Sequence, residues 1–156
     1  MISVNRDRFK CLWLAMVVLW LGLFSNALSA QGDVELLADG ALLDSDGITV
    51  NFYENNTNRP AVLVFWGTWC PHCRALMPHL ERLRKGFAPA VNFYALNVWE
   101  DSDPVAHMAD NGYEFHLLLD ADAVAKTYGI TGTPGLIVVD ENRGVIYVRR
   151  SGTSPK

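Results

Sequence analysis

Residues 61–66, with the sequence AVLVFW, form a run of apolar, mostly β-forming residues, and a helical pattern begins soon after them. Because every position in the run is apolar, and not every second one, we expect a strand that is covered on both faces, as in a parallel sheet. The helix is predicted from about Pro71 to Lys85, since proline suits a first helical turn. A buried strand leading directly into a helix indicates an α/β fold.

The predicted helix has an apolar stripe and a charged face. The apolar side chains recur at helical spacing and are expected to be buried, namely Leu76, Leu80, Leu83 and Phe87. The charged side chains are expected to face water, namely Arg74, Glu81, Arg82 and Lys85. Glu81 and Lys85 lie one turn apart, a spacing at which opposite charges support each other.

The rest of the chain alternates between predicted strands and helices. Strands are expected at 48–53, 91–98, 115–119, 136–139 and 145–149, and helices at 104–111 and 122–128. The first of these strands is expected to form a hairpin with residues near Leu42, and the last two form another. This order predicts a mixed central sheet flanked by helices.

The first thirty residues have the layout of a targeting segment. A short basic stretch is followed by uncharged, largely apolar residues from Cys11 to Phe24, and then by a smaller and more polar stretch. We interpret residues 1–30 as a signal peptide or an N-terminal membrane anchor, with residues 11–30 as the anchoring part. Positive residues before an apolar segment stay inside the cell, so the domain at 31–156 is expected to be periplasmic or otherwise extracytoplasmic.

Composition limits the partners. Half of the residues are hydrophobic and 19% are charged, which is typical of a globular domain. The formal net charge is −4, and we see no basic stripe that could neutralise phosphates. We therefore expect no nucleic-acid partner.

Two cysteines lie where the predicted strand meets the helix, in the segment Trp69-Cys70-Pro71-His72-Cys73. At the first turn of a helix, this spacing allows a disulfide without movement of the backbone. Cys70 is expected at the positive end of the helix dipole, which favours its thiolate, and a protonated His72 would favour it further. We predict that Cys70 attacks and that Cys73 resolves the mixed disulfide.

Other uses of a C-x-x-C pair fit less well. A structural disulfide at this spacing closes a small loop and stabilises little. A zinc site needs a second pair of ligands, and none of the remaining histidines has a suitable spacing. Haem attachment needs a histidine directly after the second cysteine, where this chain has Arg74. We expect redox catalysis with no metal and no cofactor.

Several further residues have simpler interpretations. Glu100, Asp101 and Asp103 are expected to complement a helix N-terminus and not to bind a cation. Trp66 is either a core residue or part of an aromatic surface beside the cysteines. We expect the remaining histidines, among them His107, to be surface or hydrogen-bonded residues.

The chain resembles the thioredoxin superfamily, and in particular its exported TlpA/ResA-type branch of thiol–disulfide oxidoreductases. The resemblance covers roughly residues 48–150. It rests on the strand at 61–66, the W-C-P-H-C segment with C-R-A-L-M-P after it, and the segments V-A-K-T-Y-G-I at 124–130 and T-G-T-P-G at 131–135. It implies a thioredoxin-like fold and the activity of a protein-disulfide oxidoreductase.

The resemblance also implies roles for individual residues. Pro134 is expected to be a cis-proline beside the disulfide, and the backbone of Thr133 to pair with an extended substrate segment. Trp69 is expected to contact substrate. The implied partners are exported protein thiols or disulfides, together with a membrane or periplasmic redox partner.

The chain departs from the family pattern near the cysteines. Many relatives have a buried acid at the position of Val64, and TlpA/ResA-like proteins often have a glutamate at the position of Leu76. Such an acid helps to move a proton to or from the second cysteine. The Pro71-His72 dipeptide, expected to tune the thiol pKa, is similar to that of DsbA-type oxidants. The scaffold thus favours a reductase and the dipeptide an oxidant, so the direction of electron flow stays open.

The fold usually ends with a helix over one sheet face, and this chain stops soon after its last predicted strand. We expect that helix to be absent, so that either the sheet is partly uncovered or the sequence is incomplete. The alternative function is a thioredoxin-like binding module. It would hold an extended partner at the Thr133–Pro134 loop, and its redox chemistry would be slow or incidental.

Overall fold

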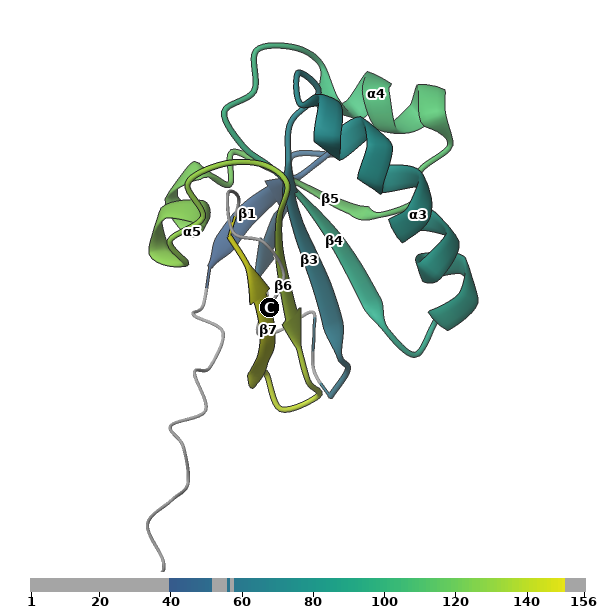
Figure 1. Cartoon of the computed structure of the whole chain (residues 1–156), viewed down its shortest axis with the longest axis vertical. Coiled ribbons are helices and arrows are strands. Elements are labelled where there is room, and N and C mark those ends of the chain that lie inside the picture. The colour runs from purple at the N-terminus through teal and green to yellow at the C-terminus, as the bar shows by residue number, and fades with distance from the viewer. Residues whose placement is uncertain (1–39, 52–55, 57, 151–156) are drawn as a thin grey trace, which may run out of the picture. The chain divides into compact units, whose positions relative to one another are not determined.

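A computed structural model describes residues 40–51, 56 and 58–150 of the chain. Seven strands form one mixed sheet in the order β2-β1-β5-β4-β3-β6-β7 (Figure 1). The strands are β1 (Ala41–Asp44), β2 (Thr49–Asn51), β3 (Ala61–Trp66), β4 (Asn92–Asn97), β5 (His116–Leu119), β6 (Gly135–Val139) and β7 (Val145–Arg149). The helices of the described part are α3 (Pro71–Phe87), α4 (Pro104–Asn111) and α5 (Asp122–Thr127). The α/β fold with a mixed sheet is therefore confirmed.

Strand β3 lies inside the sheet, as its apolar sequence predicts. It is parallel to β4, with Trp66 opposite Asn97 at one end, and antiparallel to β6. β4 is in turn parallel to β5. Leu63, Val64 and Phe65 are all buried, because helices cover both faces of the strand.

Helices on the two sides of the sheet create two apolar cores (Figure 1). On one side α3 and α4 pack against β3, β4 and β5, and this core includes Val64, Trp66, Cys70, Cys73, Met77, Leu80, Phe93 and Met108. On the other side α5 and the segment after it pack against the same strands and β6, and this core includes Leu63, Phe65, Leu96, Leu118, Ala125, Tyr128, Ile130 and Ile137. Alternate residues of β3 thus enter opposite cores, as the strand period requires.

The ends of the elements follow the predicted signals closely. The Asp103 carboxylate accepts a hydrogen bond from the Ala106 N–H at 2.9 Å and caps α4, and Gly112 ends that helix in the left-handed conformation. β1 and β2 form the first hairpin, and β6 and β7 form the last. In the described part of the chain, which ends at Arg150, no helix follows β7.

The interpretation of residues 1–30 lies outside the described residues. Within the described part, none of the helices has the length and apolar character needed to span a bilayer.

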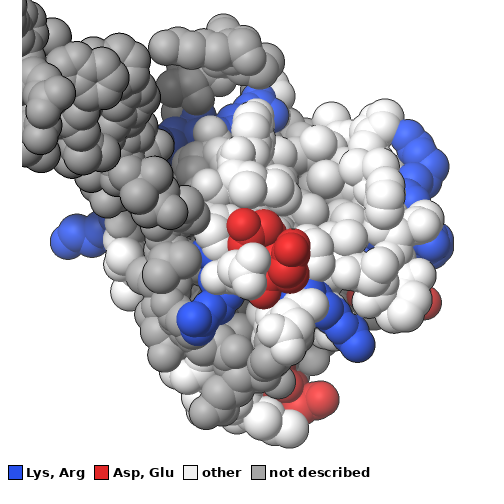
Figure 2. Space-filling view, turned by 90° about the horizontal axis from the view of Figure 1, so that it is seen from below, with Lys and Arg blue, Asp and Glu red and all other residues white. Residues whose placement is uncertain are grey.

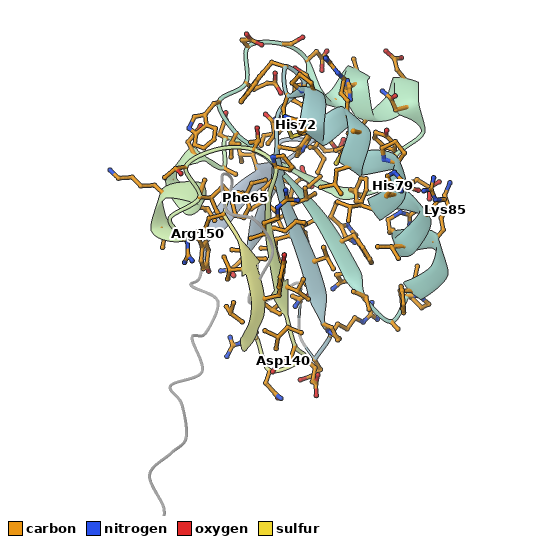
Figure 3. All side chains as sticks on the ribbon, viewed as in Figure 1. Phe65, His72, His79, Lys85, Asp140 and Arg150 are labelled. Carbon is orange, nitrogen blue, oxygen red and sulfur yellow. A yellow bond between two sulfur atoms is a disulfide. The ribbon has the colours of Figure 1, made fainter. Side chains whose placement is uncertain are left out.

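Asp140, labelled at the foot of Figure 3, lies in the β6–β7 loop. Figure 2 shows the molecule from this end. Acidic and basic side chains lie near one another there and are separated by uncharged residues.

The buried face of α3 differs from the predicted stripe. Leu83 and Phe87 are 49% and 54% exposed, whereas Met77 is fully buried and Glu81 is almost so. The inward row instead runs through Cys73, Met77, Leu80 and Glu81. This row has helical spacing too, and the expectation was wrong because it treated Glu81 as a surface charge.

Glu81 can be buried because its charge is compensated. Its two carboxylate oxygens accept hydrogen bonds from Arg84 at 2.8 and 2.9 Å, and Lys85 lies 3.5 Å away. Arg84 also contacts Glu114, in the segment before β5. The hydrogen bonds from Arg84 lower the pKa of Glu81 below its ordinary value of 4.5, although burial opposes this. The pair thus ties α3 to the segment before β5.

We expect the Glu81–Arg84 pair to make the stability of the fold depend on pH. Because the pKa of Glu81 is lower in the folded chain than in the unfolded chain, its contribution is complete above the ordinary value of 4.5 and is lost as the pH falls through the folded value. At pH 7 the Glu81→Gln variant should be less stable by about 1–2 kcal/mol. Urea unfolding from neutral to acidic pH should show this difference shrinking. The exposed Glu141→Gln is the control, and a constant difference would contradict the expectation.

Candidate active site at the N-terminus of α3

Cys70 and Cys73 form a disulfide at the start of α3, with their Cα atoms 5.2 Å apart. Cys70 is the N-cap of the helix, and its Sγ accepts a hydrogen bond from the Cys73 backbone N–H at 3.1 Å. The first turn contains Pro71, as expected, and no acidic side chain. Unpaired N–H groups and the helix dipole therefore act on the Cys70 sulfur, an environment that favours a thiolate.

The disulfide is covered by the core. Cys70 and Cys73 are only 2% and 1% exposed, and they pack in the same cluster as Val64 and Trp66. Val64 and Leu76 are apolar, so neither of these two positions supplies an acid that could move a proton to or from Cys73. Trp66, for which two interpretations stayed open, is a core residue.

Aromatic side chains form one rim of the site. Trp69 is 42% exposed, and its indole N–H donates a hydrogen bond to the Trp99 carbonyl at 2.8 Å. Trp99, itself 41% exposed, follows β4 and has a positive φ of 49°. Its backbone N–H is held by the Asp122 carboxylate at 2.8 Å. Trp99 was missed in the sequence, although it follows a parallel strand just as the cysteine segment follows β3.

A second rim consists of the loop before β6. The Thr133–Pro134 peptide bond is cis, as the family resemblance implies. A pocket of about 450 Å³ separates this loop from α3, and the side chains lining it include His72, Leu76, His79, Thr133, Pro134 and Arg149. Figure 3 shows His72 at the N-terminal end of α3 and His79 farther along the same helix. The predicted residues Thr133, Pro134 and His72 thus meet at one pocket, and Trp69 belongs to the other rim.

Glu100 binds the segment that precedes the cysteines. Its carboxylate accepts hydrogen bonds from the Thr68 N–H and hydroxyl at 3.0 and 2.5 Å, and from the Asn97 amide at 2.6 Å. The backbone N–H groups of Asp101 and Ser102 add two more. Burial raises the pKa of Glu100, but these hydrogen bonds together hold it below the ordinary value. Glu100 therefore does not cap α4 as expected, and only Asp103 does.

The remaining histidines contact aromatic rings. His107 lies between Trp66 and Tyr113, with ring centroids 5.4 and 6.5 Å away, and His116 lies 5.2 Å from Tyr94. In the described ranges, no group of three or more His, Cys, Asp or Glu side chains could hold a metal ion.

Comparison with known proteins identifies the family. The model of the Redoxin family matches residues 29–156. The chain belongs to the Redoxin family. Among curated Redoxin-like relatives, the thiol-disulfide oxidoreductase ResA of Halalkalibacterium halodurans is 28% identical, with the match covering 94% of this chain and 90% of that protein. The thioredoxin-like protein YneN of Bacillus subtilis is 31% identical, with 63% of this chain and 59% of that protein covered.

Solved structures confirm the fold of this Redoxin domain. A thioredoxin-family thiol:disulfide interchange protein from Chlorobium tepidum has a TM-score of 0.70 at 20% identity, with 80% of this chain and 91% of that chain covered. StoA from Bacillus subtilis has a TM-score of 0.61 at 20% identity, with 74% and 89% covered. The Redoxin match and the ResA and YneN relatives, and not these structures, confirm the predicted membership of the thioredoxin superfamily on its ResA-like side.

Proposed function

We propose that this Redoxin-family chain is a protein-disulfide oxidoreductase that acts on exported protein thiols or disulfides through Cys70 and Cys73. The observation that carries the proposal is the position of Cys70 as the N-cap of α3, with its sulfur accepting the Cys73 N–H. A thiolate formed there is stabilised, which makes Cys70 a good nucleophile and a good leaving group. The ResA relative of Halalkalibacterium halodurans, a thiol-disulfide oxidoreductase by name, supports the same activity.

The exchange proceeds through a mixed disulfide in either direction. In reduction, the Cys70 thiolate attacks a substrate disulfide, which forms one S–S bond and releases one substrate thiolate. Cys73, once deprotonated, then attacks the Cys70 sulfur and releases the second substrate thiol. The substrate gains two electrons and two protons, and the Cys70–Cys73 disulfide is restored. In oxidation, a substrate thiolate attacks the Cys70 sulfur, and the same steps run in reverse.

The two rims position the substrate in this proposal. The Thr133 backbone pairs with an extended substrate segment beside the disulfide. Trp69 and Trp99 offer exposed aromatic surface for substrate. Residues 1–30 export the domain or hold it at the membrane, where a membrane or periplasmic redox partner resets the cysteines.

The reduction potential of the cysteine pair tests the function and its direction. Equilibration of the full chain with glutathione buffers should give a value above that of thioredoxin, about −270 mV, because Cys70 caps the helix and no acidic side chain lies in its first turn. A value near that of DsbA, about −120 mV, would assign an oxidant, and a value at or below about −270 mV a reductase. The His72→Ala variant should shift the potential downward if His72 stabilises the thiolate, with exposed Lys85→Ala as the control.

If the chain does not exchange with glutathione at all, this result would contradict the proposed oxidoreductase function. That result would leave the alternative of a binding module, which holds a partner at the Thr133–Pro134 loop.

A further inference from the structure

Two residues that line the pocket between α3 and the Thr133–Pro134 loop each have a buried polar atom without a partner. The Nε of Arg149 and the hydroxyl of Thr133 are buried, and neither has a hydrogen-bond partner among the described residues. A buried polar group without a partner costs about 1–3 kcal/mol, so a native structure seldom keeps two of them in one place without a use. Both atoms belong to residues that line the pocket, but neither atom is itself exposed to it, so a ligand would reach the guanidinium of Arg149 through its other N–H groups.

The polar lining consists of donors. Arg149 has only N–H donors and is charged at every physiological pH. The Nδ1 of His79 lies 2.5 Å from the guanidinium of Arg82, which cannot accept, so Nδ1 is the acceptor and the ring proton sits on Nε2. Thr133 adds a hydroxyl, and no acid is found among the described residues that line the pocket. A ligand that matches this set must offer acceptors and negative charge.

We propose that this pocket binds a carboxylate side chain, from an aspartate or glutamate that lies close to the target cysteine in the substrate polypeptide. The inference rests on the proposed function and adds a substrate class to it. The guanidinium of Arg149 pairs with the carboxylate, His79 donates to it, and Leu76 packs against its methylene groups. His72, between the two cysteines, also lines the pocket, so the carboxylate is bound close to the reacting sulfur.

The net charge of the chain disfavours binding of an acidic peptide. A measured preference for an acidic peptide would therefore indicate a local binding site. The formal net charge is −4, so an acidic peptide is repelled at long range. Faster reaction with an acidic peptide than with a neutral one therefore requires a local cationic site.

The test compares two cysteine peptides that differ only by glutamate or glutamine two residues from the cysteine. Each reduced peptide reacts with the oxidised full chain in a non-ionic detergent at fixed ionic strength, and tryptophan fluorescence follows the loss of the disulfide. We expect the glutamate peptide to react about tenfold faster, which corresponds to about 1.4 kcal/mol. Arg149→Gln should remove this preference, so that the two peptides react at equal rates, whereas Lys126→Gln, an equal loss of charge at an exposed residue of α5, should keep the preference.

Each outcome has a separate meaning. Equal rates for the two peptides in the unaltered chain overturn the carboxylate pocket but leave the oxidoreductase intact. A preference that survives in Arg149→Gln also overturns the pocket. No reaction with either peptide contradicts the proposed function itself. If Arg149→Gln does not fold by circular dichroism, Arg149→Lys keeps the charge and removes the guanidinium fork, and the pocket then requires a reduced preference in that variant.

Discussion

The Cys70→Ser variant is expected to lose thiol–disulfide exchange completely, down to the uncatalysed rate. Serine keeps the N-cap hydrogen bond but has no nucleophilic sulfur, so no mixed disulfide forms at the helix N-terminus. The Cys73→Ser variant should differ in kind. Its Cys70 still attacks a peptide disulfide, but no second thiol resolves the product. Mass spectrometry should therefore detect a stable mixed disulfide on Cys73→Ser and none on Cys70→Ser.

The third cysteine provides the matched control. Cys11 lies in the predicted targeting segment, and Cys11→Ser removes one thiol while leaving the C-x-x-C pair in place. It should exchange at the rate of the unaltered chain. A mixed disulfide that accumulates on Cys70→Ser and not on Cys73→Ser would reverse the roles proposed for the two cysteines.

Local signals were sufficient to predict most elements of the fold. The apolar run at 61–66 identifies β3 as a buried strand, because only a strand with both faces covered needs that pattern. Asp103 and Gly112 mark the two ends of α4, since both act within one turn of their own position. The Cys70–Cys73 pair is also a local signal, because its residues lie within one helical turn, and the structure contains the disulfide that this spacing allows.

Features that depend on distant partners were not predictable in the same way. Glu81 is buried because Arg84 and the segment at Glu114 surround it, and helical spacing alone cannot show that contact. The pocket needs Arg149, which comes from the last strand and lies close to α3 only after the sheet has formed. Trp99 is a comparable case, because a positive φ turns the chain there and no glycine signals it.

The parallel pairing of β3 and β4 explains why the site lies where it does. Trp66 is opposite Asn97, so the segments that follow the two strands leave the sheet at the same edge. One of these segments leads to the cysteines and the other contains Trp99 and Glu100. The polar atoms of Thr68 consequently meet the carboxylate of Glu100, thirty-two positions away in the sequence. The active-site segment is thus held by a residue that no motif would identify.

The Glu100→Ala variant is therefore expected to be destabilised by about 2–3 kcal/mol, because hydrogen bonds to a charged acceptor are strong and the Thr68 N–H and the Asn97 amide lose their partner. Urea unfolding of the oxidised chain measures this loss. Asp101→Ala removes the neighbouring carboxylate, for which no hydrogen bond is found within the described residues, and should change stability by less than about 0.5 kcal/mol.

Glu100→Gln separates charge from shape in the same experiment. Glutamine nearly preserves the volume, but its NH₂ group faces donors where Glu100 offers a second acceptor oxygen. We expect it to recover only part of the lost stability. Because Thr68 lies two residues before Cys70, the alanine variant should also exchange disulfides more slowly, as a loosened segment no longer fixes the start of α3. A variant with full stability and an unchanged exchange rate would show that the Glu100 hydrogen bonds do not hold the site.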